Sequence, residues 1–369
     1  MASPVVSIVP VRFEPNVHAA VLRAVEEAME LADWRHHIPR GAAVALKPNL
    51  GWDLFLPGAV TGPWVIEGVA RMLCGWAGKL YLVESDQVVV HVERAFRYSR
   101  LGPLCERYGI TWVNMTHMPL VRIPVPRPRV LSELLVPELL RDTVLVTLPV
   151  MKTHNKTTIT GAIKNQWGCL PMFRHQYHLV LDAALADINQ VARPAFAVMD
   201  ATVGLEGNSP KSGLPRVVNR VLASADAVAL DAVAARMMGF DPASIGHLLE
   251  CHAAGLGEYC LERISVRGEP LDGIELRFLP ARHNLVSWME LVLRKRPWLR
   301  PLVFDTPLFG LCCWLTTVYY DVWYSVLGIG RRRRDWIVHH TPYGAQWAAP
   351  EAIEPEPQER GEHRCASGS

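Results

Sequence analysis

The sequence predicts an α/β protein built on a mostly parallel sheet. Short apolar runs rich in β-branched residues alternate with longer segments of helical spacing up to about residue 270, which is the pattern of βα units. Several of the short runs are apolar throughout, as strands covered on both faces are. Half of the residues are hydrophobic and 20% are charged, a composition that excludes bulk disorder.

The individual elements follow in a regular order. Strands are predicted at the β-branched runs, residues 5–10, 43–48, 79–83, 111–114, 143–149, 195–199 and 217–223. Helices are predicted where apolar residues recur at helical spacing, at residues 16–31, 63–75, 92–108, 179–191 and 226–238. Residues 118–140 are rich in proline and are expected to form an irregular insertion before the chain returns to the sheet.

This order divides the chain into three parts. We expect one α/β domain over residues 1–270, a helical and apolar C-terminal extension over residues 271–340, and a disordered acidic tail over residues 341–369. The tail alternates proline with glutamate between residues 351 and 362, a composition that cannot bury enough apolar surface to fold. The mean hydropathy of +0.12 is high for a protein of this class, and the apolar excess falls in the extension.

The extension places an apolar stretch between two basic clusters. Between Thr306 and Gly330 the one charged residue is Asp321, and clusters of lysine and arginine occupy residues 294–300 and 331–334. Aromatic residues flanked by cations are typical of a membrane interface, so residues 294–334 are predicted to contact an anionic membrane as an interfacial hairpin. Asp321 argues against a simple span. The alternative is a helical cap on the sheet or a dimer interface.

Composition also limits the partners and the location. A net charge of +2 gives no global field that would attract nucleic acid, so no nucleic-acid partner is expected. The N-terminal residues lack the basic start and long apolar stretch of a secretory signal. We therefore expect a cytoplasmic protein that is peripheral on the inner face of the membrane.

Polar residues follow several predicted strands. Lys47 and Asn49 end one strand, Lys152 and Thr153 end another, and Asp200 ends a third. Ligands of open parallel sheets bind beyond the carboxyl ends of the strands, so these residues are predicted to share one ligand-binding rim. The alternative is that they are ordinary polar loop residues and helix caps.

The segment from Lys152 to Cys169 is the densest group of polar residues. It contains His154, Thr158, Lys164 and Asn165, which are poor core material. If a helix begins near Thr157 or Thr158, its free backbone N–H groups would lie beside Lys152 and bind a phosphate or carboxylate. The alternative is a solvated, well-capped helix start.

A glycine-rich segment follows Asp200. It contains Gly204, Glu206, Gly207 and Gly213, and its backbone amides could face an anion. It lacks the spacing of a Walker A loop, and a long surface turn is the alternative.

These segments together predict a site for an anionic small molecule. Lys47, Lys152 and Lys164 would neutralise the ligand, Asn49 and Asn165 would orient it, and the 204–213 loop would close over it. The candidates for proton transfer, and so the predicted catalytic residues, are His154, Asp200 and Glu206. Whether the protein is an enzyme stays open; a non-catalytic, membrane-peripheral assembly factor or cofactor carrier is the alternative.

A metal centre is not expected. The cysteines include no Cys-x-x-Cys pair, so neither a zinc ribbon nor a cubane cluster can be built from their spacing. His175 and His178 have a ligand-like spacing near Cys169, but no carboxylate or cysteine recurs at fixed offsets, and a surface or substrate-binding role is favoured.

Several of these motifs carry a resemblance. The chain contains Lys47-Pro48-Asn49-Leu50, then Lys152-Thr153-His154, then Thr160–Asn165, and finally the runs 200–213, 223–235 and 238–242. In this order they resemble the domain-of-unknown-function family 362 (DUF362), over about residues 43–260. The resemblance implies a conserved α/β unit.

Many members of that family carry an appended ferredoxin-type module with cysteine-rich runs. This chain departs from them, because its cysteines after residue 270 are Cys312, Cys313 and Cys365 alone. No intrinsic iron–sulfur cluster is therefore expected and the cofactor is unknown. Redox chemistry with a separate, external electron donor is the activity that the resemblance favours.

Overall fold

The computed structural model describes residues 3–14, 16–282, 285–296 and 298–347. A ten-stranded sheet in the order β12-β1-β11-β10-β7-β2-β3-β4 runs through its centre, and β8 and β9 continue from β10. All of the pairings are parallel except those that involve β11 and the β8–β9 pair, so the predicted α/β class is confirmed. The strands are β1 (Val5–Pro10), β2 (Ala43–Pro48), β3 (Lys79–Glu84), β4 (Thr111–Asn114), β7 (Val144–Leu148), β8 (Val150–His154), β9 (Thr158–Ile159), β10 (Phe196–Glu206), β11 (Leu214–Ser224) and β12 (Ser265–Gly268).

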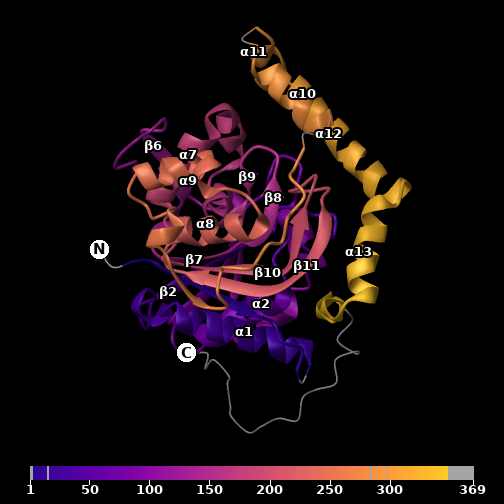
Figure 1. Ribbon diagram of the computed structural model, residues 1–369. Helices are drawn as coiled ribbons and strands as arrows, with labels where there is room; N and C mark the ends of the chain where they lie inside the picture. Colours follow the sequence, from indigo (N-terminus) through magenta and orange to yellow (C-terminus); the bar gives the residue numbers. More distant parts are fainter. Residues whose placement is uncertain (1–2, 15, 283–284, 297, 348–369) are drawn as a thin grey trace.

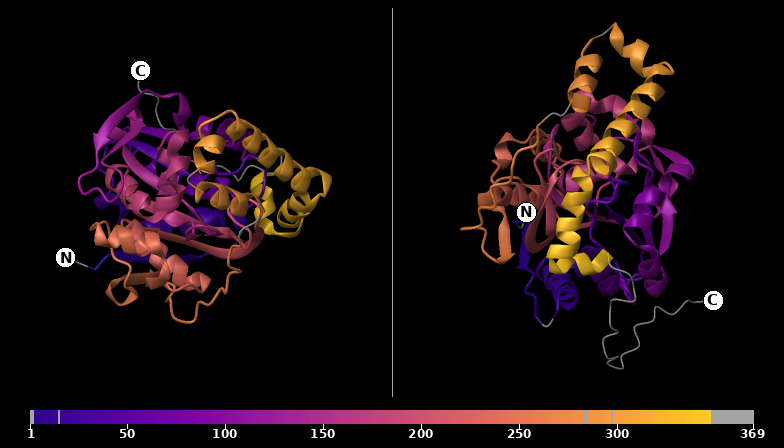
Figure 2. Two further views of the ribbon diagram at one scale, coloured as in Figure 1. Left: turned by 90° about the horizontal axis from the view of Figure 1, so that it is seen from above. Right: turned by 90° about the vertical axis from the view of Figure 1, so that its right-hand side faces the viewer.

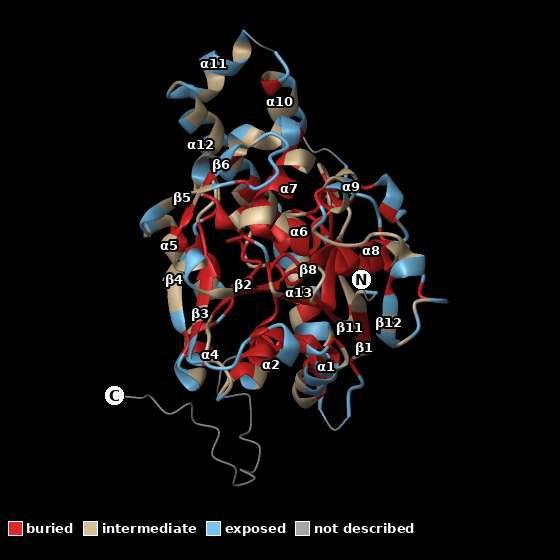
Figure 3. Cartoon of the chain, turned by 90° about the vertical axis from the view of Figure 1, so that its left-hand side faces the viewer, coloured by how far each residue is buried: buried red, intermediate tan, exposed pale blue. Residues whose placement is uncertain are grey.

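Helices cover both faces of the sheet, and each face has its own hydrophobic core (Figures 1 and 3). Within β2, Val44 and Leu46 belong to the core beneath α1 and α2, whereas Ala45 belongs to the core beneath α7 and α8. Successive strand residues point to opposite faces, which explains why these strands are apolar throughout. The covering helices are α1 (Val17–Leu31), α2 (Pro63–Leu73), α6 (Gly161–Asn165), α7 (Leu181–Val191), α8 (Ala227–Met238) and α9 (Gly246–Ala253).

Capping residues fix where two of these helices begin. Asn16 Oδ1 accepts from the Ala19 N–H, and Asp226 Oδ1 accepts from the N–H groups of Val228 and Ala229. Each cap satisfies backbone donors that the first turn leaves unpaired. The residues directly before α1 and α8 therefore determine where these two helices begin.

Three predicted elements differ from those observed. The helix predicted over 92–108 is two helices separated at Arg100, which has a positive φ of 55°. The strand predicted over 143–149 is followed at once by β8, so residues 144–154 form two strands with Pro149 between them. The irregular insertion contains a hairpin and a short helix. These elements are α3 (Val92–Tyr98), α4 (Gly102–Tyr108), β5 (Leu120–Pro124), β6 (Glu133–Pro137) and α5 (Glu138–Arg141).

The glycine-rich loop predicted after Asp200 is also corrected. Strand β10 continues through Asp200 to Glu206 and pairs with β11 as a long antiparallel hairpin. The connection is confined to residues 207–213, which include a cis peptide bond between Ser209 and Pro210. Gly204 thus lies in a strand and not in a loop.

The C-terminal residues form a chain of helices that leaves the body with α10, turns at α11 and returns to the body with α12 and α13 (Figures 1 and 2). We call α10, α11 and α12 the helical arm; it stands out from the body in Figure 2. No helix in the described part of the chain is both long and apolar enough to cross a membrane. The helices are α10 (Leu285–Arg294), α11 (Leu299–Phe304), α12 (Leu308–Asp321), a π-helical turn (Val322–Val326) and α13 (Ile329–His340).

The inner side of this chain of helices packs against the body. Tyr320 and Tyr324 are buried, and the Tyr324 hydroxyl donates to the Phe55 carbonyl at 2.7 Å. Residues 342–347, which the sequence assigned to the tail, form a 3-10 helix whose Tyr343 hydroxyl donates to Asn219 Oδ1 at 2.9 Å. The remainder of the predicted tail, residues 348–369, lies outside the described residues.

Candidate functional site

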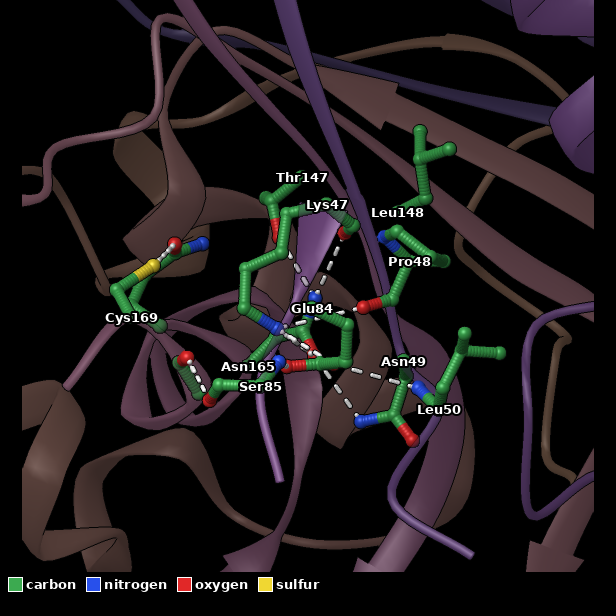
Figure 4. Close-up of polar contacts among 12 residues, drawn as sticks. Lys47, Pro48, Asn49, Leu50, Glu84, Ser85, Thr147, Leu148, Asn165 and Cys169 are labelled. Carbon is green, nitrogen blue, oxygen red and sulfur yellow. Dashed lines mark hydrogen bonds and ion pairs between the residues drawn. The ribbon is translucent and has the colours of Figure 1, made fainter. Parts of the chain in front are cut away.

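One buried network at the carboxyl ends of the strands joins Lys47, Asn49, Glu84, Lys152 and Asn165. Figure 4 shows its part around Lys47, Glu84 and Asn165. Lys47 Nζ donates to Glu84 Oε2 at 2.9 Å, and the two side chains are 1% and 3% exposed. An ion pair that is withdrawn from water in this way needs further hydrogen bonds to offset its desolvation. The sequence predicts that Lys47 neutralises a bound ligand. In the structure its partner is Glu84, a carboxylate of the protein itself.

Asn165 provides the hydrogen bonds that connect the two lysines. Its amide nitrogen donates to the Lys47 carbonyl at 3.1 Å and to Thr147 Oγ1 at 2.8 Å, and its amide oxygen accepts from Asn49 Nδ2 at 3.0 Å. Lys152 Nζ donates in turn to Asn49 Oδ1 and to the Ala59 carbonyl, both at 2.8 Å. Burial lowers the pKa of Lys152 to about 7.

The two carboxylates predicted to transfer protons are hydrogen-bonded elsewhere. Asp200 Oδ2 accepts from the Gly62 N–H at 2.7 Å, at the start of α2, and its Oδ1 accepts from both the N–H and the hydroxyl of Thr202. Burial raises the pKa of Asp200. Glu206 pairs with Arg216 at 2.8 Å. The structure therefore gives both carboxylates local structural partners.

The predicted helix start at Thr157 or Thr158 is wrong. Thr158 lies in β9 with a positive φ of 62°, and α6 begins at Gly161. The N–H groups of Ala162 and Ile163 donate to the two oxygens of Asp231 at 2.6 and 2.9 Å. This helix end already holds a carboxylate from α8, so it does not offer the anion site that the sequence predicted.

The remaining predicted residues serve the packing of the β8–β10–β11 region. The Thr153 hydroxyl donates to the Gly207 carbonyl at 3.2 Å, and Gly207 adopts a positive φ of 71° at the turn. A Cβ on Gly204 would lie 2.7 Å from the Met151 carbonyl oxygen, and one on Gly213 would lie 2.6 Å from Leu205 Cγ. These two glycines therefore allow close approach within the protein.

A cavity of about 470 Å³ lies between the body and the helical arm; we call it the basic pocket. The body contributes the end of β8, α6 and the 208–211 turn, and the arm contributes the inner sides of α10, α11 and α12. Of the predicted site residues, His154 and Lys164 line it. The charged residues that line it are Lys156, Lys164, Lys211, Arg282, Glu290 and Arg294.

Glu290 attaches the arm to the body at one edge of this pocket. Its carboxylate lies 2.6 Å from Lys156 Nζ, 2.6 Å from His178 Nδ1 and 2.9 Å from Arg294 Nε. Although burial opposes ionisation, the hydrogen bond from His178 and the charge of Lys156 keep the pKa of Glu290 well below its usual range. The negative charge of Glu290 is thus balanced by neighbouring side chains of the protein.

Lys164 and Lys211 have a different environment. Lys164 Nζ lies over the Trp167 ring at 4.8 Å, and Lys211 Nζ lies over the Trp52 ring at 5.0 Å. Within the described part of the chain, neither ammonium group forms an ion pair with a carboxylate. Burial, together with the surrounding cations, lowers the pKa of Lys164, and burial lowers that of Lys211 to about 8. A bound anion would supply the missing counter-charge.

His154 faces this pocket in a defined tautomer. Its Nδ1 accepts the Lys156 N–H at 3.0 Å, so the neutral ring carries its proton on Nε2. Burial and then the charge of Lys164 lower the pKa of His154. In this state the ring is a hydrogen-bond donor, which suits contact with an anion better than the general-base role predicted for it.

Sequence reasoning left Lys211, Lys156 and Glu290 out of the site. Lys211 stands in the turn between β10 and β11, and Glu290 lies on a helix more than a hundred residues along the chain from Lys156. The missing counter-charge at Lys211 could not be seen without the fold. Among the described residues, no group of three or more His, Cys, Asp and Glu side chains is placed to hold a metal ion.

Comparison with known proteins gives a family and one named relative. The Thylakoid-associated protein sll1697 of Synechocystis sp. (strain ATCC 27184 / PCC 6803 / Kazusa) is 28% identical over 266 residues, which cover 68% of this chain and 79% of that protein. No solved structure matches. The model of the family described as domain of unknown function DUF362 matches residues 44–236, just over half of the chain. That range contains the buried network, Asp231 and the body side of the basic pocket, and the chain belongs to this family.

Proposed function

We propose that this protein binds an anionic small molecule in the basic pocket. The observation that carries the proposal is the pair Lys164 and Lys211: two partly buried ammonium groups that face aromatic rings and have no carboxylate partner among the described residues. The nearby carboxylate, Glu290, is already paired with Lys156 and Arg294. Burial and then the repulsion of nearby cations lower the pKa of Lys164, and a negatively charged ligand would offset both effects.

Binding, rather than a particular reaction, is what this geometry supports best. Asp200 and Glu206, two of the three predicted catalytic residues, are not among the described residues that line the pocket. His154 does line it, and its Nε2–H would donate to the ligand. Redox chemistry with an external electron donor would act on a ligand held in this way, and a carrier role would need the binding step alone.

Titration with simple anions tests the binding. We expect sulfate and inorganic pyrophosphate to bind the full-length protein in isothermal titration calorimetry. Lys164→Ala and Lys211→Ala should each weaken binding about tenfold or more, because each removes a charge-assisted contact. Lys79→Ala, which removes an exposed lysine at the start of β3, is the control and should bind normally. Equal binding by all four proteins would contradict the proposal.

A second proposal concerns where the protein acts. We propose that the helical arm attaches it to the cytoplasmic, inner face of an anionic membrane as a peripheral protein. On the arm and its connecting turn, Trp288, Trp298 and Trp314 are 56%, 70% and 60% exposed, and Lys295, Arg296 and Arg300 are exposed beside them. Exposed tryptophans next to cations favour a headgroup interface. The thylakoid association named for the relative supports this proposal.

The basic cluster at residues 331–334 contributes less to the proposed membrane surface than its sequence suggests. Arg333 Nη1 donates to the carbonyls of Ser212 and Gly213, and Arg334 pairs with Asp335 at 2.6 Å. Of this cluster, Arg331 and Arg332 are exposed. The proposed membrane surface is therefore the arm, with these two arginines as a peripheral addition.

Sedimentation with vesicles tests the membrane proposal. The protein should sediment with vesicles that contain phosphatidylglycerol and much less with pure phosphatidylcholine, and salt should weaken the interaction. Replacing Trp288, Trp298 and Trp314 by serine should abolish sedimentation. Trp336→Ser, which removes a tryptophan of similar exposure from α13 (51%), should not. Normal sedimentation of the triple variant would refute the role of the arm.

A further inference from the structure

The two walls of the basic pocket differ in chemistry. The body wall presents the ammonium groups of Lys164 and Lys211, with His154 beside them. The arm wall is mostly apolar and includes Leu293 of α10, Phe304 of α11 and Leu315 of α12. An inorganic anion that is bound by the lysines would leave the apolar wall facing water, which is unfavourable for that much apolar surface.

The pocket is also larger than a small anion needs. Its volume of about 470 Å³ is in the range of sites for drug-sized ligands. A sulfate or phosphate group fills a minor part of such a space, because one water molecule accounts for only about 30 Å³. The remaining volume lies against the apolar wall.

The apolar wall continues from the pocket to the surface of the arm. Met289 and Leu315 line the pocket, yet they are 46% and 52% exposed. Trp288 and Trp314, the neighbouring residues on the same helices, belong to the proposed membrane surface. An apolar track therefore connects the lysines with the face that we assign to lipid.

We propose that the ligand of the basic pocket is an anionic amphiphile with a phosphate or carboxylate head and a long apolar chain. Its head binds Lys164 and Lys211, and its chain lies along the inner sides of α10 and α12 toward the membrane surface. This inference rests on the proposed anion binding and names the class of ligand. The arm then has two roles, since its outer side contacts lipid and its inner side covers the chain.

Chain length separates this inference from simple anion binding. We expect monoalkyl phosphates to bind with affinity that rises from ethyl to octyl to dodecyl phosphate, below their micelle concentrations and without vesicles. Each methylene that is fully buried should tighten binding up to about fourfold. Dodecyl trimethylammonium has the same chain and a cationic head, and it should not bind.

Two leucines one turn apart on α12 provide matched variants. Leu315 lines the pocket and is 52% exposed, whereas Leu311 is 51% exposed and is not among the described lining residues. Leu315→Asn should weaken dodecyl phosphate binding about tenfold and leave ethyl phosphate binding unchanged. Leu311→Asn should change neither. Lys164→Ala should weaken the binding of both phosphates.

The outcomes distinguish the two proposals. If ethyl and dodecyl phosphate bind with equal affinity, the amphiphile is refuted and anion binding stands. If dodecyl phosphate binds but Lys164→Ala and Lys211→Ala do not weaken it, or if dodecyl trimethylammonium binds equally well, the head does not lie on these lysines and the inference fails. If no phosphate binds, the proposed function fails with it.

Discussion

Two pairs of lysines have opposite environments in the structure, although the sequence predicts that three of the four share one site. Lys47 and Lys152 belong to the buried network, where Glu84, asparagine side chains and a backbone carbonyl accept their hydrogen bonds. Lys164 and Lys211 line the basic pocket and face aromatic rings without a carboxylate partner in the described chain. A lysine at the end of a strand is therefore not by itself evidence of a ligand.

The difference lies in what surrounds each charge. A buried charge must be paired or hydrogen-bonded to be tolerated, and the buried network satisfies its members internally. The pocket lysines instead lack a carboxylate partner among the described residues and have a cavity in front of them. We therefore assign stability to the first group and binding to the second, and substitutions in the two groups should separate these effects.

The largest effect is expected from Glu84→Ala, because it leaves Lys47 buried without its partner. The free energy of unfolding should fall by about 3–5 kcal/mol, the usual result of breaking a buried ion pair. Urea denaturation followed by circular dichroism measures it. Glu106→Ala, which removes an exposed glutamate of α4, should change the stability by less than about 0.5 kcal/mol. A similar small change for Glu84→Ala would show that the network is not structural.

A comparison of Lys152→Ala with Lys164→Ala should show a smaller but clear difference. Loss of Lys152 leaves Asn49 Oδ1 and the Ala59 carbonyl without their donor. The free energy of unfolding should therefore fall by about 3 kcal/mol. The Lys164 side chain donates no hydrogen bond to another described residue, so its loss should lower the free energy of unfolding by less than about 1 kcal/mol while anion binding weakens. Equal loss of stability by the two variants would remove the distinction between the groups.

Gly168→Ala tests how tightly the network is enclosed. A Cβ at this position would lie 2.4 Å from Glu84 Oε1 and 2.8 Å from Lys47 Nζ. The added methyl group would force these groups apart, and the free energy of unfolding should fall by about 2 kcal/mol, as overpacking typically causes. Gly102→Ala is the control, because nothing lies within 4 Å of the added atom. Thermal unfolding of both variants measures the difference, and a Gly168→Ala protein as stable as the control would mean that the network can adjust.

Much of the fold could be predicted because local patterns determine it. The apolar run of β2 serves two cores at once, and Asp226 caps α8 from the adjacent position in the chain. Both signals lie within a few residues of the element they specify. The same is true of Asn16 and α1.

The site could be predicted only in part, because its partners are distant in the sequence. Lys47 and Glu84 come from two neighbouring strands, and nothing in either segment shows that they pair. Asp231 comes from α8, far along the chain, yet it accepts from the first N–H groups of α6, near the position predicted for the anion. Glu290 and the apolar wall come from the extension, which the sequence associated with a membrane, a helical cap or a dimer interface and not with the ligand site.

The smallest effect expected is the pH dependence of anion binding. The charged form of Lys211 is the form that binds, and its pKa in the free protein is lowered to about 8. Binding should therefore be strongest below pH 8 and weaken by up to about tenfold per pH unit above it, until the higher pKa of the complex is reached. Sulfate is the suitable probe because its own charge does not change in this range. Lys211→Arg keeps its charge throughout, so its affinity should fall less between pH 8 and 9.5, and an unchanged profile would place the titration on another group.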